Sequence, residues 1–337
     1  MNRPPPPIPG PQRNTPWRTV SAVVSGARHR LHQQACQDVL RTAVIDEHRL
    51  LVTLADGAGS AKYGGDGAEL ATAAALRRLA GYRPASTPPA SASGPADDLP
   101  ATIRQSLADA RTAIEQEAAR RKVAPRELAT TLLVAVATAD WIAAGQIGDG
   151  AVIWGEGADE WRTLTRPASG EYLNETVFVT SEGALATAQI VRQEGPVREV
   201  ALFSDGLQML ALKLATAEPH APFFRPLFRW HREARDPIAA ARTLDQWLRS
   251  PRVTERTDDD LSLCLAAWDT PWPFSSSSPP NVQSAHDSAG TRTPAAGRDD
   301  SPKRDGPSRS AGPHKPVDFS ADYTSAATAG CIDTEVA

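Results

Sequence analysis

The stretch between residues 17 and 268 consists of short apolar runs separated by polar turns. In the first run, residues 19–22 alternate between polar and apolar side chains, which is the two-residue period of a β-strand. Later runs such as 50–55 end at an aspartate followed by glycine, a pair typical of turns. Strands are predicted at 17–24, 39–45, 50–55, 130–138, 141–147, 151–154, 161–165, 177–180, 189–191, 197–203 and 261–268.

Helical spacing is recognisable in four segments. From Gly65 onward apolar residues recur near a 3.6-residue period, and Asp66 is predicted to cap this helix. A second helix is predicted to begin at Asp98, and the two helices are expected to pack together over a sheet. Further helices are predicted at 207–214 and 238–247, and a polar loop or hairpin at 26–36. Strands and helices grouped in runs, without strict βαβ alternation, indicate an α+β layered domain.

The two ends of the sequence differ in composition from its middle. Residues 1–16 are rich in proline and poor in apolar side chains, and residues 270–337 are rich in serine, proline and glycine. Such segments bury too little apolar surface to offset the entropy of ordering them, so a disordered arm and a disordered tail are predicted. One folded domain is therefore predicted at 17–269.

Bulk properties narrow the class of protein. The 337 residues carry a formal net charge of -4 with an isoelectric point near 6.0, so no basic field is present and nucleic acid is not an expected partner. No run approaches the roughly 20 apolar residues that span a bilayer, and the first residues lack the apolar core of a signal peptide. A cytoplasmic protein with no membrane partner is therefore expected.

Five short acidic motifs carry the candidate chemistry, and most of them follow an apolar run. They are Gln37-Asp38, Asp56-Gly57-Ala58-Gly59, Gly148-Asp149-Gly150, Ser204-Asp205-Gly206 and Asp259-Asp260-Leu261-Ser262. Any one of them alone is best interpreted as a turn. Together they predict carboxylates gathered at strand ends, where like charges need a cation. Carboxylate and carbonyl oxygens suit magnesium, manganese and calcium, and glycine lets a backbone carbonyl approach the ion.

The order of these motifs resembles that of the metal-dependent type 2C protein phosphatases, and of their bacterial branch in particular, over residues 17–268. The resemblance implies a four-layer α+β sandwich, in which helices flank two antiparallel β-sheets and the metals lie in a cleft at one end. It implies a catalytic domain at 17–269, two Mn²⁺ or Mg²⁺ ions, a third and looser ion, and a monomer.

The resemblance also implies a role for each acidic residue. Asp56 corresponds to the carboxylate that bridges two metals, and Gly57 supplies a backbone carbonyl. Asp205 and Asp259 correspond to further metal ligands, Asp38 to the residue that holds metal-bound water, and Asp149 to a ligand of the third ion. Asp38 and Asp56 are thus the expected catalytic residues. Asp260 is expected to form hydrogen bonds as a neighbour of the site.

A dinuclear centre accounts for the expected reaction. Two divalent ions about 3.5 to 4 Å apart lower the pKa of a bridging water and hold a phosphate for in-line attack. The predicted reaction is hydrolysis of phosphoserine and phosphothreonine esters by a metal-bridging hydroxide, without a covalent phosphoenzyme. The expected partners are a phosphorylated protein substrate and a Ser/Thr kinase that the enzyme opposes.

Two departures from the family pattern concern the substrate. Some members have a histidine proton donor where this chain has Ala58, and many have a phosphate-binding arginine where it has Gln33 and Gln34. Arg30 is the first candidate for phosphate binding, ahead of neighbours in its loop that include His29. The stretch 167–182 corresponds to the mobile flap of the family, and its polar residues are Glu171, Asn174 and Glu175.

Two other functions are compatible with parts of the pattern. A catalytically weak or inactive phosphatase-like module that binds phosphoproteins would explain the missing arginine, although a binder has no need for every carboxylate. A calcium-stabilised structural domain fits less well, because calcium sites commonly take their ligands from one contiguous loop and the sequence contains none.

Overall fold

The structure is a computed structural model that describes residues 16–46, 48–83, 98–167 and 176–269. The predicted tail and nearly all of the predicted arm lie outside these residues, so both stay predictions. Among the helices within the described ranges, none has the length and apolar character needed to cross a membrane.

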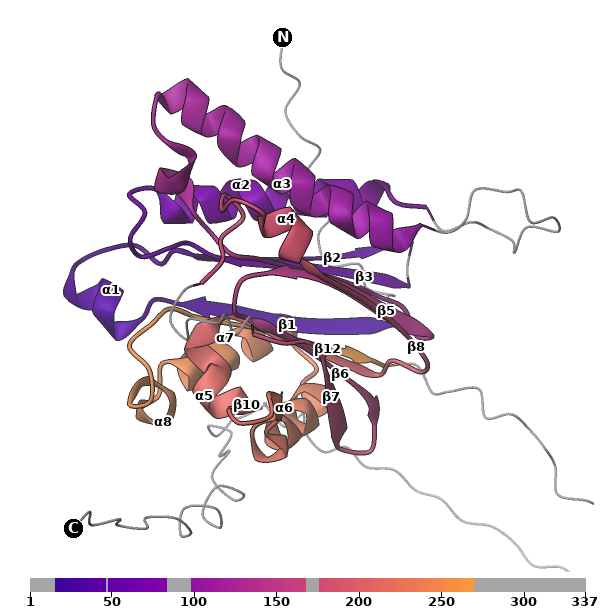
Figure 1. The fold of residues 1–337 in the computed structure, drawn as a ribbon. Helices are drawn as coiled ribbons and strands as arrows, with labels where there is room; N and C mark the ends of the chain where they lie inside the picture. Colours follow the sequence, from indigo (N-terminus) through magenta and orange to yellow (C-terminus); the bar gives the residue numbers. More distant parts are fainter. Residues whose placement is uncertain (1–15, 47, 84–97, 168–175, 270–337) are drawn as a thin grey trace, which may run out of the picture. The chain divides into compact units, whose positions relative to one another are not determined.

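Two five-stranded sheets with antiparallel pairing form the centre of the fold (Figure 1). The first sheet has the order β1 (Trp17–Val24), β12 (Leu261–Trp268), β9 (Glu199–Phe203), β6 (Ala151–Gly157) and β7 (Glu160–Thr165). The second has the order β2 (Asp38–Ile45), β3 (Arg49–Asp56), β4 (Leu132–Ala137), β5 (Trp141–Ile147) and β8 (Gln189–Glu194). A small separate pair joins β10 (Leu212–Lys213) to β11 (Glu218–Pro219).

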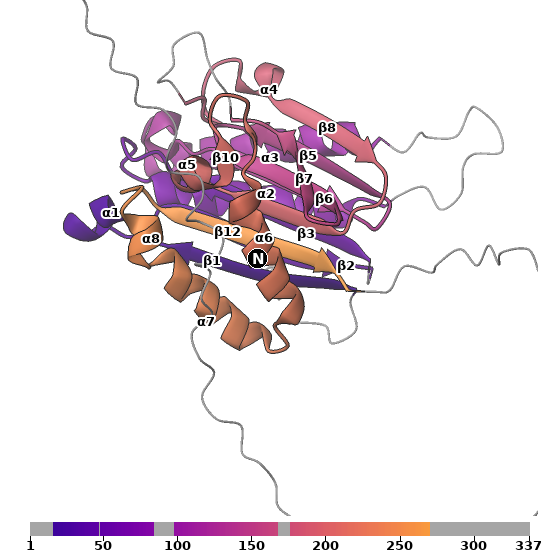
Figure 2. The same ribbon diagram turned by 90° about the horizontal axis from the view of Figure 1, so that it is seen from below.

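Helices cover the outer face of each sheet. The long helices α2 (Gly64–Gly81) and α3 (Leu99–Arg121) lie on the second sheet, and α6 (Ala221–Glu233) and α7 (Pro237–Leu248) lie on the first (Figures 1 and 2). The predicted four-layer sandwich is therefore confirmed. The short helices are α1 (Ala27–Leu31), α4 (Ala184–Thr187), α5 (Gln208–Ala211) and α8 (Pro251–Thr254), with 3-10 turns η1 (Pro125–Leu128) and η2 (Asp205–Leu207).

The run at 50–55 in strand β3 is apolar except for Thr53, because both faces of this strand are buried. Successive side chains of a strand point to opposite faces. Val52 therefore packs in the cluster between the sheets, whereas Leu51 packs against the helices of the second sheet. Both are fully buried, and each buried side chain of this size stabilises the fold by roughly 1.5–3 kcal/mol.

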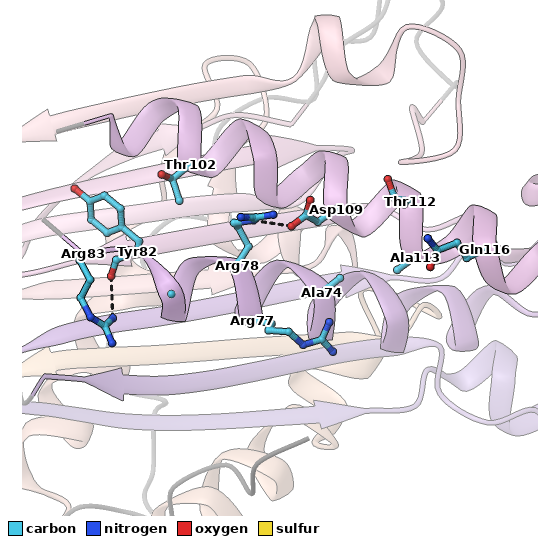
Figure 3. Close-up of a pocket in the computed structure, with 11 residues that line it drawn as sticks. Ala74, Arg77, Arg78, Tyr82, Arg83, Thr102, Asp109, Thr112, Ala113 and Gln116 are labelled. Atoms are coloured by element: carbon cyan, nitrogen blue, oxygen red, sulfur yellow. Dashed lines mark hydrogen bonds and ion pairs between the residues drawn. The ribbon is translucent and has the colours of Figure 1, made fainter. Parts of the chain in front are cut away.

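The helices α2 and α3 pack side by side over the second sheet, as predicted. Ala71 and Ala75 of α2 share a buried cluster with Ile103 and Leu107 of α3. Asp98 caps α3 by accepting a hydrogen bond from the backbone N–H of Ala101 at 2.9 Å, which confirms the predicted start of this helix. On the outer side, Arg78 Nε donates to Asp109 Oδ2 at 2.6 Å (Figure 3).

Several local predictions are wrong. Asp66 lies in the first turn of α2, whose N-cap is Tyr63, so Asp66 is not the cap. Residues 177–180 form no strand, and the segment at 26–36 contains the short helix α1. The helix predicted at 207–214 ends at Ala211, where β10 follows.

Helix α6 is the largest element that the sequence did not predict. Pro226 lies inside it, and proline removes a backbone hydrogen bond of a helix and crowds the preceding turn. The helix forms nevertheless because Phe224, Leu227 and Phe228 are buried against the first sheet. Packing of the apolar face thus outweighs the local penalty of the proline.

Candidate metal centre

All five acidic motifs lie at one end of the two sheets. Asp38 begins β2 and Asp56 ends β3, and the antiparallel register places them directly opposite each other. Asp205 follows β9 after one intervening residue, and Asp259 lies just before β12. Asp149 lies in the turn between β5 and β6. Strand direction therefore brings together residues that are far apart in the sequence.

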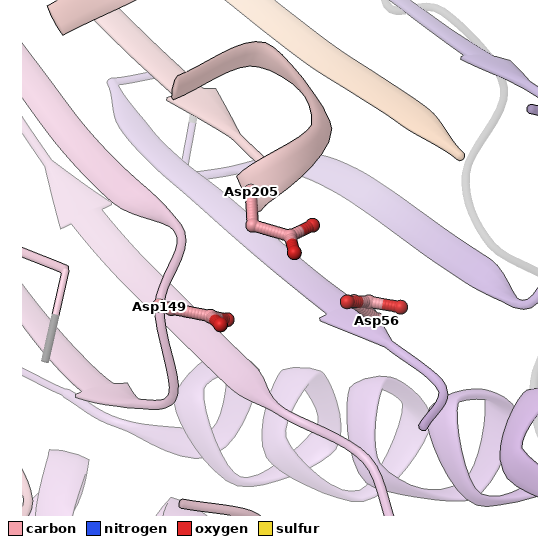
Figure 4. A group of neighbouring side chains, drawn as sticks. All are labelled: Asp56, Asp149 and Asp205. Atoms are coloured by element: carbon pink, nitrogen blue, oxygen red, sulfur yellow. The ribbon is translucent and has the colours of Figure 1, made fainter. Parts of the chain in front are cut away.

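Three carboxylates form a close cluster. One carboxylate oxygen from each of Asp56, Asp149 and Asp205 lies within 4.8 Å of the others, and the three side chains point toward one another (Figure 4). Both carboxylate oxygens of Asp38 and Oδ1 of Asp149 are buried without a hydrogen-bond partner among the described residues. Buried polar atoms without partners are unfavourable, so these oxygens fit a bound cation.

Burial and mutual repulsion change the acidity of these groups. Burial raises the pKa of Asp38 to about 7. Burial, followed by the charges of Asp149 and Asp259, raises the pKa of Asp205 to about 8. The pKa of Asp56 is also raised well above its usual range, by burial first and then by the charge of Asp38. Among the described residues, no positive charge lowers the pKa of Asp38, Asp56 or Asp205 to compensate for this repulsion.

The backbone around Asp56 is fixed by two threonines that precede β4. Thr131 Oγ1 accepts a hydrogen bond from the Asp56 N–H at 2.9 Å, and the Thr131 N–H donates to the Asp56 carbonyl at 2.8 Å. Thr130 Oγ1 donates to the same carbonyl at 2.8 Å. These bonds hold the carboxylate of Asp56 in place without using its oxygens.

Gly57 lies where β3 approaches the start of α2. A Cβ atom at this position would lie 2.4 Å from the carbonyl carbon of Gly64, so any other side chain would force the two segments apart. The side-chain amide of Gln37 faces the Gly57 carbonyl, and with its nitrogen on that side the hydrogen bond measures 2.9 Å. Glycine is thus required by close backbone contact.

Asp260 connects the beginning of β12 to the segment before β2. Its Oδ1 accepts a hydrogen bond from the Gly26 N–H at 2.7 Å and lies 2.8 Å from Nδ1 of His29. Its Oδ2 accepts from the Gln37 N–H at 2.6 Å. The hydrogen-bonding role expected for Asp260 is therefore confirmed. These bonds fix the position of Asp38, which follows the partner residue Gln37 in the chain. They also fix Asp259, which precedes Asp260 itself.

Comparison with known proteins agrees with this geometry. The family profile described as Protein phosphatase 2C matches residues 25–249. The chain belongs to the protein phosphatase 2C family. It is 36% identical over 265 residues to Serine/threonine-protein phosphatase 3 of Escherichia coli (strain K12). The aligned region covers 75% of this chain and 98% of that protein.

Solved structures of phosphatases share the fold. Serine/threonine phosphatase Stp1 from Staphylococcus aureus aligns with a TM-score of 0.52 at 14% identity, covering 77% of this chain and 99% of that one. The catalytic domain of the phosphatase PstP, in complex with 2 manganese ions, aligns with a TM-score of 0.50 at 16% identity, covering 74% and 97%. The predicted family and fold are thus confirmed.

The phosphatase 2C fold brings most of the predicted site residues together, but not all of them. Asp259 is half-buried, and its charge acts on Asp56 and Asp205, although it lies outside the cluster of three. Arg30 is exposed on α1, where its guanidinium donates to the Ser25 carbonyl.

Two contacts of the phosphatase site went unrecognised in the sequence. His29 is only 7% exposed and pairs with Asp260, so it is not available to reach a phosphate as considered above. Thr176 Oγ1 donates to Asp149 Oδ2 at 2.7 Å. The predicted flap residues Glu171, Asn174 and Glu175 lie outside the described residues.

Proposed function

We propose that this phosphatase hydrolyses phosphoserine and phosphothreonine esters of proteins at a centre of two Mn²⁺ or Mg²⁺ ions. The observation that carries the proposal is the carboxylate cluster of Asp56, Asp149 and Asp205, with unpartnered buried oxygens on Asp38 beside it. The proposed ligands of the two ions are Asp38, Asp56, the Gly57 carbonyl, Asp205 and Asp259. Asp149 is the proposed ligand of a third, looser ion.

The side chains of this chain prepare the site for that chemistry. When bound, two divalent ions would activate a water and neutralise the charge of the phosphate. Asp38 is the proposed residue that orients the attacking water, because neither of its oxygens has a hydrogen-bond partner among the described residues and it lies opposite Asp56. Ala58 has no acidic proton, so it cannot protonate the leaving group from the place where some members of the family have a histidine.

Metal removal tests the proposal. We expect the protein to hydrolyse para-nitrophenyl phosphate in manganese, to lose this activity in EDTA, and to regain it when manganese is restored, because the proposed reaction needs the metal to activate water. Calorimetry with manganese distinguishes the alternative of an inactive phosphoprotein-binding module. Manganese binding without turnover of a phosphopeptide would favour that module, and turnover that survives EDTA would rule out the metal centre.

Arg30 is the proposed phosphate-binding residue. Its guanidinium is exposed on the segment that leads to Asp38, and arginine forms paired hydrogen bonds with phosphate. We expect Arg30→Ala to raise the KM for a phosphopeptide by about tenfold, the value of one charged hydrogen bond. The neighbouring Arg28→Ala serves as control. An equal rise in KM in both variants would show a general effect of charge on α1 and would contradict a specific contact between Arg30 and the phosphate.

Asp260→Ala is expected to weaken manganese binding although Asp260 is not a proposed ligand. Removal of its carboxylate leaves the N–H groups of Gly26 and Gln37 without their acceptors, which frees the segment that carries Asp38. We expect a loss of about 10–100-fold in manganese affinity, measured by calorimetry, and about 3 kcal/mol in unfolding free energy. The exposed Asp258→Ala is the control. Unchanged affinity in folded Asp260→Ala protein would show that the contact is only structural.

The biological setting is also proposed. Substrates of the phosphatase are phosphoproteins, and we propose that a Ser/Thr kinase phosphorylates the same proteins. We further propose a cytoplasmic monomer. Cell fractionation tests the location, and sedimentation at equilibrium tests the oligomeric state, since a concentration-dependent mass would exclude a monomer.

A further inference from the structure

An open groove of about 690 Å³ lies between the C-terminal half of α2 and the facing side of α3 (Figure 3). Arginines line it on the α2 side, and α3 supplies mostly neutral polar side chains. We name it the arginine groove and define it by Arg77, Arg78 and Arg83 together with Thr102, Asp109 and Thr112. None of these residues belongs to the metal centre.

The groove carries positive charge that is only partly compensated. Asp109 is the one carboxylate among the described residues that line the groove. It is already engaged, because Oδ2 accepts from Arg78 Nε at 2.6 Å and Oδ1 accepts from Gln105 Nε2 at 2.9 Å. Arg77 and Arg83 form no ion pair with a carboxylate in the described ranges, although the charge of Arg77 also acts on Asp109. Two guanidinium groups therefore remain for an external anion, on a protein whose net charge is -4.

The structure holds one of these groups in position. Arg83 Nη1 donates to the carbonyls of Ala80 and Tyr82, at 2.9 and 3.1 Å, at the C-terminal end of α2. The other guanidinium nitrogens of Arg83 lie on an exposed residue and can bind a carboxylate or phosphate. A guanidinium that is already oriented loses less entropy when it binds an anion.

We propose that the arginine groove binds an acidic segment of the phosphoprotein substrate, at a distance from the phosphate that is hydrolysed, an inference that rests on the proposed function. Charge complementarity selects this occupant. The groove offers about two free positive charges between two helices, which suits a short run of carboxylates. Nucleic acid requires a broader basic surface, which the acidic chain does not provide.

The position of the groove sets the number of residues between the acidic segment and the phosphorylated residue of such a substrate. Helix α2 begins at Gly64, which contacts the backbone of Gly57 and Ala58 at the metal end. At 1.5 Å per residue, Arg77 lies about 20 Å further along the helix axis. An extended peptide covers this distance in about six residues. The acidic segment should therefore lie at least about six positions from the phosphorylated residue.

Paired phosphopeptides test the proposal with the full-length protein in manganese. One peptide carries four glutamates about eight residues from its phosphothreonine, and its partner carries four glutamines there. We expect Arg77→Ala/Arg83→Ala to raise the KM for the glutamate peptide by about three- to tenfold, as for two exposed ion pairs, with kcat unchanged. The KM for the glutamine peptide and the turnover of para-nitrophenyl phosphate should not change.

A matched control and a binding measurement complete the test. Arg225→Ala/Arg229→Ala removes two arginines from α6, on the other sheet, and should leave every KM unchanged. A labelled glutamate peptide without phosphate should bind the wild type, even in EDTA, and bind the groove variant more weakly. Equal KM values of the wild type for both peptides would overturn the proposal. The proposal would also be overturned if a labelled single-stranded RNA bound the wild type but not the groove variant, while the KM for the glutamate peptide stayed the same in both.

Discussion

The Asp56→Asn variant is expected to lose activity and gain stability together. Turnover of para-nitrophenyl phosphate should fall by about 10³-fold or more, since the proposed bridging carboxylate contributes several kcal/mol to metal-assisted catalysis. In EDTA, however, the free energy of unfolding of the variant should exceed that of the wild type by about 1 kcal/mol or more. The amide keeps the shape of the carboxylate but removes one charge from the repulsive group around Asp38 and Asp205.

Chemical denaturation in EDTA and in manganese measures both parts of this expectation. The wild type should gain stability from manganese, and the variant should gain little. Asp140→Asn is the matched control, because Asp140 is exposed in the turn between β4 and β5, away from the cluster. A metal-free Asp56→Asn protein that is less stable than wild type would contradict the idea that the carboxylates repel one another.

The metal-free phosphatase is expected to lose stability as the pH rises from 6.5 to 8.5. The folded-state pKa values of Asp38 and Asp205 are about 7 and about 8, above the value of 3.8 for an unperturbed aspartate. In this range the folded protein holds protons that the unfolded chain has released, so each rise in pH favours unfolding. The expected loss is about 2–3 kcal/mol, or about 5–10 °C in Tm.

Thermal unfolding in EDTA at several pH values tests this dependence. Starting at pH 6.5 limits the contribution of His231, because burial lowers the pKa of its imidazole to about 4. Manganese should remove most of the pH dependence, since it stabilises the ionised carboxylates. In the Asp205→Asn variant, the slope of Tm against pH in EDTA should be less than half of that of the wild type. A flat profile for the wild type in EDTA would mean that the carboxylates ionise normally.

Sequence patterns predicted those parts of the fold that depend on neighbouring residues. The run at 50–55 and the Asp-Gly turn after it lie within a few positions of each other, so both β3 and the location of Asp56 could be predicted. The order of the motifs then indicated the family. The structure adds that the apolar side chains of β3 alternate between two buried clusters, one on each face of the sheet.

Contacts across long separations could not be predicted in this way. The partners of Asp260 are Gly26, His29 and Gln37, all more than two hundred residues earlier in the chain. Nothing near His29 in the sequence identifies such a contact, and its position among basic loop residues placed it among the candidates for phosphate binding. The arginine groove likewise depends on the packing of α2 against α3.

Helix α6 was missed for a different reason. Pro226 is a strong local signal against a helix, while the apolar face that stabilises α6 becomes effective only against the first sheet. Local propensity and tertiary packing therefore oppose each other at this position, and packing prevails.

The candidate metal centre draws its carboxylates from both layers of the sandwich. Asp38 and Asp56 belong to the second sheet, and Asp205 and Asp259 flank strands of the first. A bound cation would therefore join the two sheets at one end only. Without it, repulsion acts between the layers there, and amide hydrogens near that end should exchange with solvent sooner than those at the opposite end. Metal supply would thus change the stability of the contact between the two sheets as well as the activity of the phosphatase.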